Sequence, residues 1–200
     1  MIVIMAVDEA RERAMEATRG RILDVARDLL GRKPDASMAE VAAAAGVVRR
    51  TVYGYFPARG DLIRALATEA ANEMAILLDG AIGAASAPDA IWARFVGELW
   101  PLAHRYRVLL ELRRGDHGDE IHAVLRSVDG EIASVILQGQ NDGVFGTHLP
   151  SETLARLASA IVFAIADESR GDRDLDARAA ATTSLLMLGV SEQRVSDLVG

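Results

Sequence analysis

The chain has 200 residues, a net charge of −7 and no cysteine. The lack of cysteine excludes a disulfide framework, a thiol nucleophile and a thiolate metal site, and no apolar run approaches the roughly 18 residues of a membrane-spanning helix. Seven apolar residues open the chain, but Asp8 and Glu9 follow them, and the positive segment of a signal peptide is absent. We therefore expect a cytoplasmic protein in which residues 1–15 form a flexible arm.

Two helices are predicted after this arm. The first carries apolar residues at i, i+3, i+4, i+7 and i+8, namely Ile22, Val25, Ala26, Leu29 and Leu30. The second should begin at Ser37, because Ser37 and Glu40 have the spacing of a capping box, in which each residue's side chain bonds the other's backbone N–H. It should end at Gly46, since glycine readily adopts the left-handed geometry of a tight turn.

A third, short helix is expected over roughly residues 48–55. Its inward stripe should hold Val48, Val52, Tyr55 and Phe56, which are spaced i, i+4, i+7 and i+8. Arg49, Arg50 and Tyr53 project from the opposite side, where guanidinium groups and a phenol can meet phosphates and base edges. Pro57 closes this helix, because a proline disfavours the α-helical conformation in the residue before it. Two short helices joined by a tight turn predict a DNA-binding helix-turn-helix.

Charge separates this segment from an ordinary helix pair with a solvated basic face. Between Val41 and Gly60 there are three arginines and no acidic residue. Residues 1–70 have a net charge of +1, whereas residues 71–200 have a net charge of −8. The negative field of the protein is relieved only near the turn motif, which favours a polyanionic partner there.

These residues resemble the TetR/AcrR family of bacterial transcriptional regulators. Members of that family carry a segment like A-G-V-S-x-x-T-L-Y-x-Y-F-P-S-K-E-x-L, and this chain reads AGVVRRTVYGYFPARGDL over residues 45–62. The resemblance extends upstream to the RILDVA stretch of residues 21–26 and covers about residues 18–66. It implies a three-helix DNA-binding domain at the start of the chain.

The resemblance also implies roles for individual residues. Thr51, Tyr53 and Arg59 match positions that hold DNA phosphates, and Ser37 matches a helix start that often touches one. The positions that face the major groove are matched by Arg49, Arg50 and Tyr55. Three residues depart from the pattern: Val48 and Ala58 replace serine helix caps, and Gly54 replaces a larger side chain. A missing cap costs on the order of 1 kcal/mol, so the recognition helix is expected to be looser than in the family.

Helical patterns continue to the end of the chain. The later helices are expected from Ala58 to about Ala84, over about residues 88–106 and 108–113, from Ile121 to Ile136, from a cap at Ser151, and over Ala179 to Leu188. No strand is predicted. The expected fold is all-α, with the helix-turn-helix DNA-binding domain over residues 16–66 and a helical ligand-binding and dimerisation domain over residues 67–200.

The last two of these helices are apolar on more than one side, over residues 160–166 and 179–188. Such helices need neighbours on several sides, and the resemblance implies that these positions form a four-helix dimer interface. The candidate interface residues are Ile161, Ile165, Leu185 and Leu186. The alternative is the buried core of a monomer, but two modules on successive grooves are the usual way to bind DNA with useful affinity.

The second domain should also bind a small molecule, in an apolar cavity between helices with a few polar groups. The aromatic candidates are Trp92, Phe95, Trp100, Phe145 and Phe163, each of which could instead be plain core. The candidate polar groups are Glu98, His104, Glu111 and His122. His117 and His122 are spaced i+5, which points them apart on one helix, so neither a metal site nor a cofactor is expected.

Enzymatic motifs are absent: there is no G-x-S-x-G, phosphate loop or dinucleotide fingerprint. We expect a repressor that binds a pseudo-palindromic operator as a homodimer and is released by a small molecule. By resemblance, the ligand shifts the helix that starts near Ala58 and so changes the separation of the two recognition helices, which must be about 34–36 Å. The alternative is a helical interaction or small-molecule-binding protein that does not bind DNA; salt-dependent binding to duplex DNA distinguishes the two.

Overall fold

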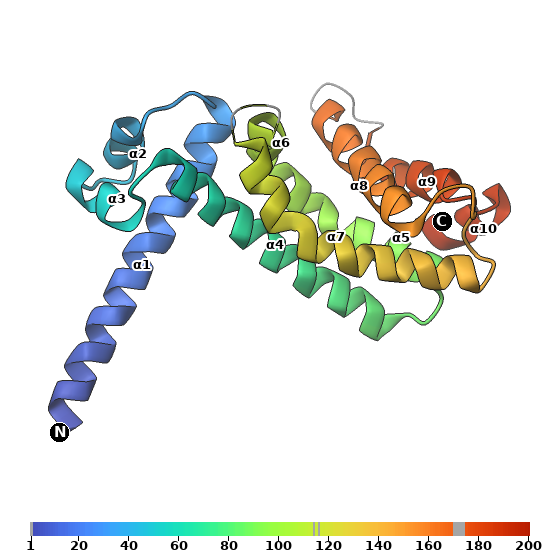
Figure 1. Ribbon diagram of the computed structural model, residues 1–200, viewed down its shortest axis with the longest axis horizontal. Helices are drawn as coiled ribbons and strands as arrows, with labels where there is room; N and C mark the ends of the chain where they lie inside the picture. Colours follow the sequence, from blue (N-terminus) through green and yellow to red (C-terminus); the bar gives the residue numbers. More distant parts are fainter. Residues whose placement is uncertain (1, 114, 116, 170–174) are drawn as a thin grey trace.

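The computed structural model describes residues 2–113, 115, 117–169 and 175–200. These residues form α1 (Ile2–Arg32), α2 (Met38–Ala44), α3 (Arg49–Tyr55), α4 (Arg59–Ala84), α5 (Pro88–Arg105), α6 (Val108–Arg113), α7 (Gly118–Asn141), α8 (Ser151–Glu168), α9 (Ala177–Met187) and α10 (Glu192–Val199). No strand occurs among them, which confirms the all-α prediction. The first three helices form one end of the molecule, and α4 leads away from them. Helix α6 lies next to the end of α1, and α5 and α7 to α10 form with α4 a bundle that extends to the other end (Figure 1).

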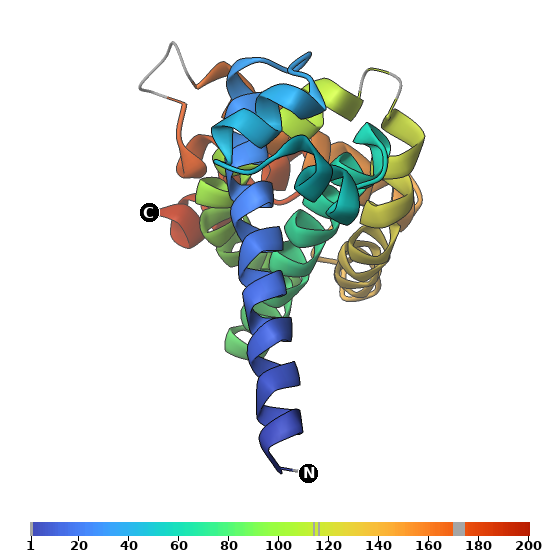
Figure 2. The ribbon, with the colours of Figure 1, turned by 90° about the vertical axis from the view of Figure 1, so that its left-hand side faces the viewer.

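Helix α1 is longer than predicted, because residues 2–15, where an arm was expected, are helical. This stretch is rich in alanine, glutamate, arginine and methionine, which are strong helix formers. Its side chains from Glu9 to Ala17 are exposed. The first half of α1 projects from the rest of the protein in both views (Figures 1 and 2).

The capping box at the start of α2 is confirmed. The backbone N–H of Ser37 donates to Glu40 Oε2 at 2.7 Å, and the N–H of Glu40 donates to Ser37 Oγ at 3.3 Å. Gly46 has a φ of +67°, the left-handed conformation that the turn requires. The prediction for Val48 was wrong: it is the extended residue before α3 and is 69% exposed, and Val47 packs against the core instead.

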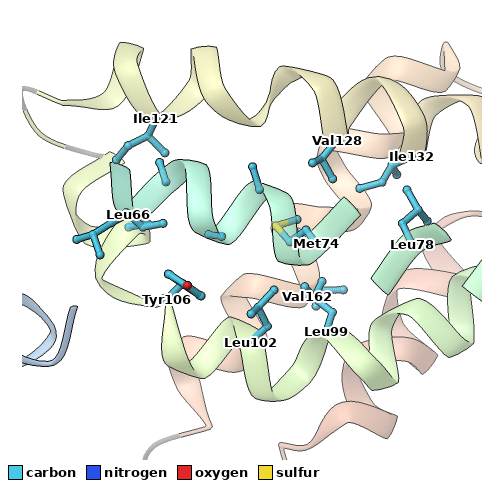
Figure 3. Packing of buried hydrophobic residues seen from close by; sticks show 14 of the residues in the cluster. Leu66, Met74, Leu78, Leu99, Leu102, Tyr106, Ile121, Val128, Ile132 and Val162 are labelled. Atoms are coloured by element: carbon cyan, nitrogen blue, oxygen red, sulfur yellow. The ribbon is translucent and has the colours of Figure 1, made fainter. Parts of the chain in front are cut away.

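Helix α4 joins the two ends of the molecule. The expected domain boundary at residues 66 and 67 lies inside this helix. Its buried residues, from Leu62 to Ala81, belong to one continuous hydrophobic core that also contains Ile22 of α1 and Val195 of α10. Figure 3 shows Leu66, Met74 and Leu78 of α4 between α5 and α7. The two expected domains therefore share a helix and a core.

Three later boundaries differ from the sequence prediction. Helix α7 continues past Gly139 to Asn141. Only glycine fits at position 139 of this helix, because the ring of Phe145 lies where a Cβ would be. Ser151 is the first helical residue of α8 rather than its cap, a position that Pro150 takes. Helix α10 was not predicted, although Ser191 caps it by accepting the N–H of Arg194. None of the described helices is long and apolar enough to cross a membrane.

The start of α4 is only half capped. The backbone N–H of Ala58 donates to Asp61 Oδ2 at 2.9 Å, but alanine has no side-chain oxygen to accept the N–H of Asp61 in return. We therefore expect Ala58→Ser to raise the free energy of unfolding by about 0.5–2 kcal/mol in denaturant titrations. Ala84→Ser, at the exposed last residue of the same helix, should leave it almost unchanged. A loss of stability in Ala58→Ser would contradict the predicted serine cap.

Candidate DNA-binding surface and ligand cavity

Helix α3 packs with its apolar side against α2 and into the hydrophobic core. Val52 and Phe56 are buried, and Tyr55 is half-buried with its ring 6.4 Å from that of Phe56. Arg49, Arg50 and Tyr53 are exposed, as the sequence spacing predicted. The outer side of this seven-residue helix is therefore accessible to a partner.

The exposed side of α3 carries unneutralised positive charge. Within the described part of the chain, neither Arg49 nor Arg50 forms an ion pair or a side-chain hydrogen bond. Thr51 is half-buried beside them. Guanidinium groups with no internal partner are free to bind phosphates or guanine edges.

Ser37 lies at the N-terminus of α2, where its hydroxyl is exposed but committed to Glu40. Lys33 Nζ also lies 2.7 Å from Glu40 Oε1. Hydrogen bonds from Lys33 and from Ser37 lower the pKa of Glu40 to about 2. Glu40 is therefore a carboxylate at neutral pH, and the Lys33 ammonium offsets its repulsion of a phosphate near Ser37.

Arg59 has an internal role that the sequence did not indicate. Its guanidinium donates to the backbone oxygens of Pro34 and Ala36, in the loop between α1 and α2. The first residue of α4 thus fixes the segment that leads into the cap of α2. A planar donor fork suits two neighbouring carbonyls better than the single ammonium of lysine.

Two substitutions at Arg59 separate this clamp from a phosphate contact. We expect both Arg59→Ala and Arg59→Lys to lower the free energy of unfolding by about 1–3 kcal/mol, because both lose the fork of hydrogen bonds. Arg59→Ala should also reduce the slope of log K for DNA binding against log salt concentration by about 0.9 per half-site. Arg59→Lys keeps the charge and should leave this slope unchanged. Unchanged unfolding in both variants would contradict the clamp.

An apolar cavity lies in the second region, between α4, α5, α6, α7 and α8. Its lining consists of Ala70, Met74, Leu102, Tyr106, Leu109, Ile121, Leu125 and Phe163. The cavity holds about 30 Å³, whereas sites for drug-sized ligands hold roughly 300–1,000 Å³. A ligand of that size would have to push the surrounding helices apart.

Of the candidate ligand residues, Phe163 lines this cavity. Trp92 and Phe95 lie in the core with ring centroids 5.8 Å apart, and Trp92 Nε1 donates to Ser184 Oγ at 2.9 Å. Phe145 packs on Gly139.

The polar candidates Glu98, His104 and His122, and the aromatic candidate Trp100, do not line this cavity and contact other groups. Glu98 pairs with Arg94, Trp100 stacks edge-on with His104, and the exposed His122 lies 2.6 Å from Gly118 O through Nδ1. The side chain of Glu111 lies outside the described residues. No group of three or more potential metal ligands occurs in the described ranges.

Most of the cavity wall was not predicted from the sequence. Met74, Leu102, Ile121 and Leu125 were recognisable as inward-facing positions of their helices, but nothing in the sequence distinguished a position beside a void from one in solid core. Tyr106 was detectable as the one polar aromatic at the end of an apolar helical stripe.

The candidate interface residues lie on α8 and α9. Ile161 and Ile165 are half-buried, and Leu186 is 41% exposed, so these three are accessible to a partner. Leu185 is fully buried within the chain and cannot be part of such a surface. Leu157, which was not a candidate, is 43% exposed one helical turn before Ile161.

Known proteins resemble the chain in its N-terminal sequence and in its fold. Residues 22–66 match the family "Bacterial regulatory proteins, tetR family". The HTH-type transcriptional repressor LfrR of Mycolicibacterium smegmatis (strain ATCC 700084 / mc(2)155) is 54% identical over 54 residues, which are 27% of this chain and 29% of LfrR. The sequence match thus spans less than a third of that curated relative.

Solved structures extend the likeness to most of the chain. LfrR from Mycobacterium smegmatis in complex with proflavine has a TM-score of 0.68 and 27% identity, over 86% of this chain and 96% of that one. FadR from Bacillus subtilis in complex with stearoyl-CoA has a TM-score of 0.72 over 85% and 97% of the two chains, but at 16% identity it shows the fold alone. Over residues 22–66 the chain thus matches the TetR family of bacterial regulatory proteins, and over most of its length its fold is similar to that of the TetR-like regulator LfrR.

Proposed function

We propose that the protein is a DNA-binding transcriptional regulator of the cytoplasm, most simply a repressor, which binds an operator as a homodimer and is released by a small molecule. The observation that carries this proposal is the exposed side of α3, where Arg49, Arg50 and Tyr53 face solvent in a protein with a net charge of −7. A short helix with free guanidinium groups fits the major groove of a duplex.

A dimer explains how one small module binds with useful affinity. The accessible side chains of Leu157, Ile161 and Leu186 on α8 and α9 support an interface there. Two copies related by a twofold axis place two recognition helices about 34–36 Å apart, in successive major grooves. The operator is therefore expected to be pseudo-palindromic.

The cavity indicates the chemistry of the ligand. Its lining is apolar apart from the hydroxyl of Tyr106, which is already hydrogen-bonded to Glu73. A largely apolar, uncharged molecule suits such walls, because a charged group would be buried there without a partner. Expansion of the cavity moves α4, so the ligand and the DNA favour different positions of this helix. Each then weakens the binding of the other by the same factor.

Selection of binding sites from random duplexes tests the proposal. The full-length protein should recover a pseudo-palindromic sequence, and its affinity for that duplex should fall steeply as salt rises, because phosphate contacts release counterions. The double variant Arg49→Ala/Arg50→Ala is the matched control and should recover no common sequence. Failure of the wild type to bind any duplex in a salt-dependent way would favour a helical interaction or small-molecule-binding protein instead.

A further inference from the structure

Tyr106 connects the cavity to the DNA-binding region. It lies at the C-terminal end of α5, is buried, and forms part of the cavity wall next to Leu102 and Leu109. Figure 3 shows it on the side of α4 opposite to Ile121 of α7. Whatever enlarges the cavity on this side must move the ring of Tyr106 or the helix that carries it.

The hydroxyl end of Tyr106 bonds to groups outside the cavity. It donates to Glu73 Oε1 of α4 at 2.7 Å, and the other carboxylate oxygen of Glu73 accepts a bond from Arg105. Burial, followed by the bond to Glu73, raises the pKa of Tyr106 to about 12. The phenol therefore remains a donor at any physiological pH, and its bond links the end of α5 to the middle of α4.

Tyr106 also contacts Arg27, which belongs to α1. Arg27 Nη1 lies 3.5 Å from the Tyr106 hydroxyl oxygen, and its guanidinium carbon lies 5.3 Å from the centre of the phenol ring. The Arg27 side chain is only 13% exposed and also pairs with Asp24 at 2.7 Å. Its buried Nε has no hydrogen-bond partner among the described residues. A half-satisfied, buried guanidinium is sensitive to any displacement of its partners.

We propose that Tyr106 transmits occupancy of the cavity to the DNA-binding region, by releasing Arg27 of α1 and Glu73 of α4 when a ligand displaces its ring. The inference rests on the proposed function, because it assigns the regulation of the same cavity. With its contact to Tyr106 broken, Arg27 no longer ties α1 to the end of α5. Helix α4 also loses the bond from Tyr106 to Glu73 and is then held to the end of α5 by the bond from Arg105 alone. The angle between the helix-turn-helix and the bundle then changes with the contents of the cavity.

The test uses the full-length protein with two apolar probes, indole and benzene. Hydrogen exchange of the backbone amides of residues 22–32 reports on α1 and does not require DNA. Saturating probe should accelerate this exchange in the wild type and should weaken binding to the selected duplex by between about 5- and 150-fold. In Tyr106→Phe and Arg27→Met the exchange should already be fast, and the probe should change neither exchange nor DNA affinity.

Two control variants separate transmission from plain packing. Phe163→Leu alters the cavity wall without touching the network, so it should change the affinity for the probe but keep the full response at saturation. Arg94→Met removes an exposed arginine of α5 and should behave as the wild type.

The outcomes discriminate between the two proposals. The relay through Tyr106 is overturned if neither probe binds, or if the probes still accelerate α1 exchange in Tyr106→Phe and Arg27→Met. If the protein selects no duplex but shows the expected exchange pattern, the proposed function is wrong and the relay through Tyr106 is still supported.

Discussion

Arg49→Ala and Arg50→Ala are each expected to relax base preference at symmetry-related positions of the selected duplex. An arginine that binds a guanine edge contributes about 1–3 kcal/mol of discrimination, and in a dimer each substitution removes that contribution twice. The affinity for the selected duplex should therefore fall by about 2–6 kcal/mol, or roughly 1.5 to 4 powers of ten, while binding to unrelated duplexes falls much less.

Quantitative binding to the selected duplex and to single-base variants of it measures this effect. Arg94→Ala, an exposed arginine on α5, is the matched control and should keep the same base preferences. If both recognition-helix variants select the same sites with the same stringency as the wild type, Arg49 and Arg50 contact only phosphates or solvent.

Trp92→Ala is expected to lower the free energy of unfolding by about 3–5 kcal/mol, the usual cost of emptying an aromatic site in a packed core. The indole is 1% exposed and also loses its hydrogen bond to Ser184 Oγ. Denaturant unfolding measures the change, and Trp100→Ala is the control, since Trp100 is half-buried and should cost clearly less. If Trp92→Ala loses little stability but no longer releases DNA in response to ligand, Trp92 belongs to the ligand site rather than to the core.

The helix-turn-helix was predictable because its signals are local. The capping box of Ser37 and Glu40, the positive φ of Gly46 and the stop at Pro57 each depend on residues within one or two turns. Even there, the helical spacing wrongly predicted that Val48 is buried, because Val48 precedes the helix and does not follow its period. Local rules identify elements well and their first residues less well.

The ligand cavity was not predictable in the same way, because it depends on which long-range neighbours leave a gap. Trp92 and Phe163 both follow helical apolar stripes, yet Trp92 fills the core beside Ser184 and Phe163 lines the cavity. The contact of Arg27 with Tyr106 joins residues 79 positions apart. Neither sequence spacing nor residue type carries information about such a pairing.

The sharing of α4 between the two ends of the molecule has a thermodynamic consequence. Cutting the chain at the expected boundary would end α4 at Leu66 and expose apolar surface from both halves, so neither half is expected to fold alone. Heat or denaturant should then melt the whole protein in a single transition. A ligand that binds the folded state would then stabilise the whole chain, including the helix-turn-helix, against global unfolding, even as it loosens α1 locally and lowers the affinity for DNA.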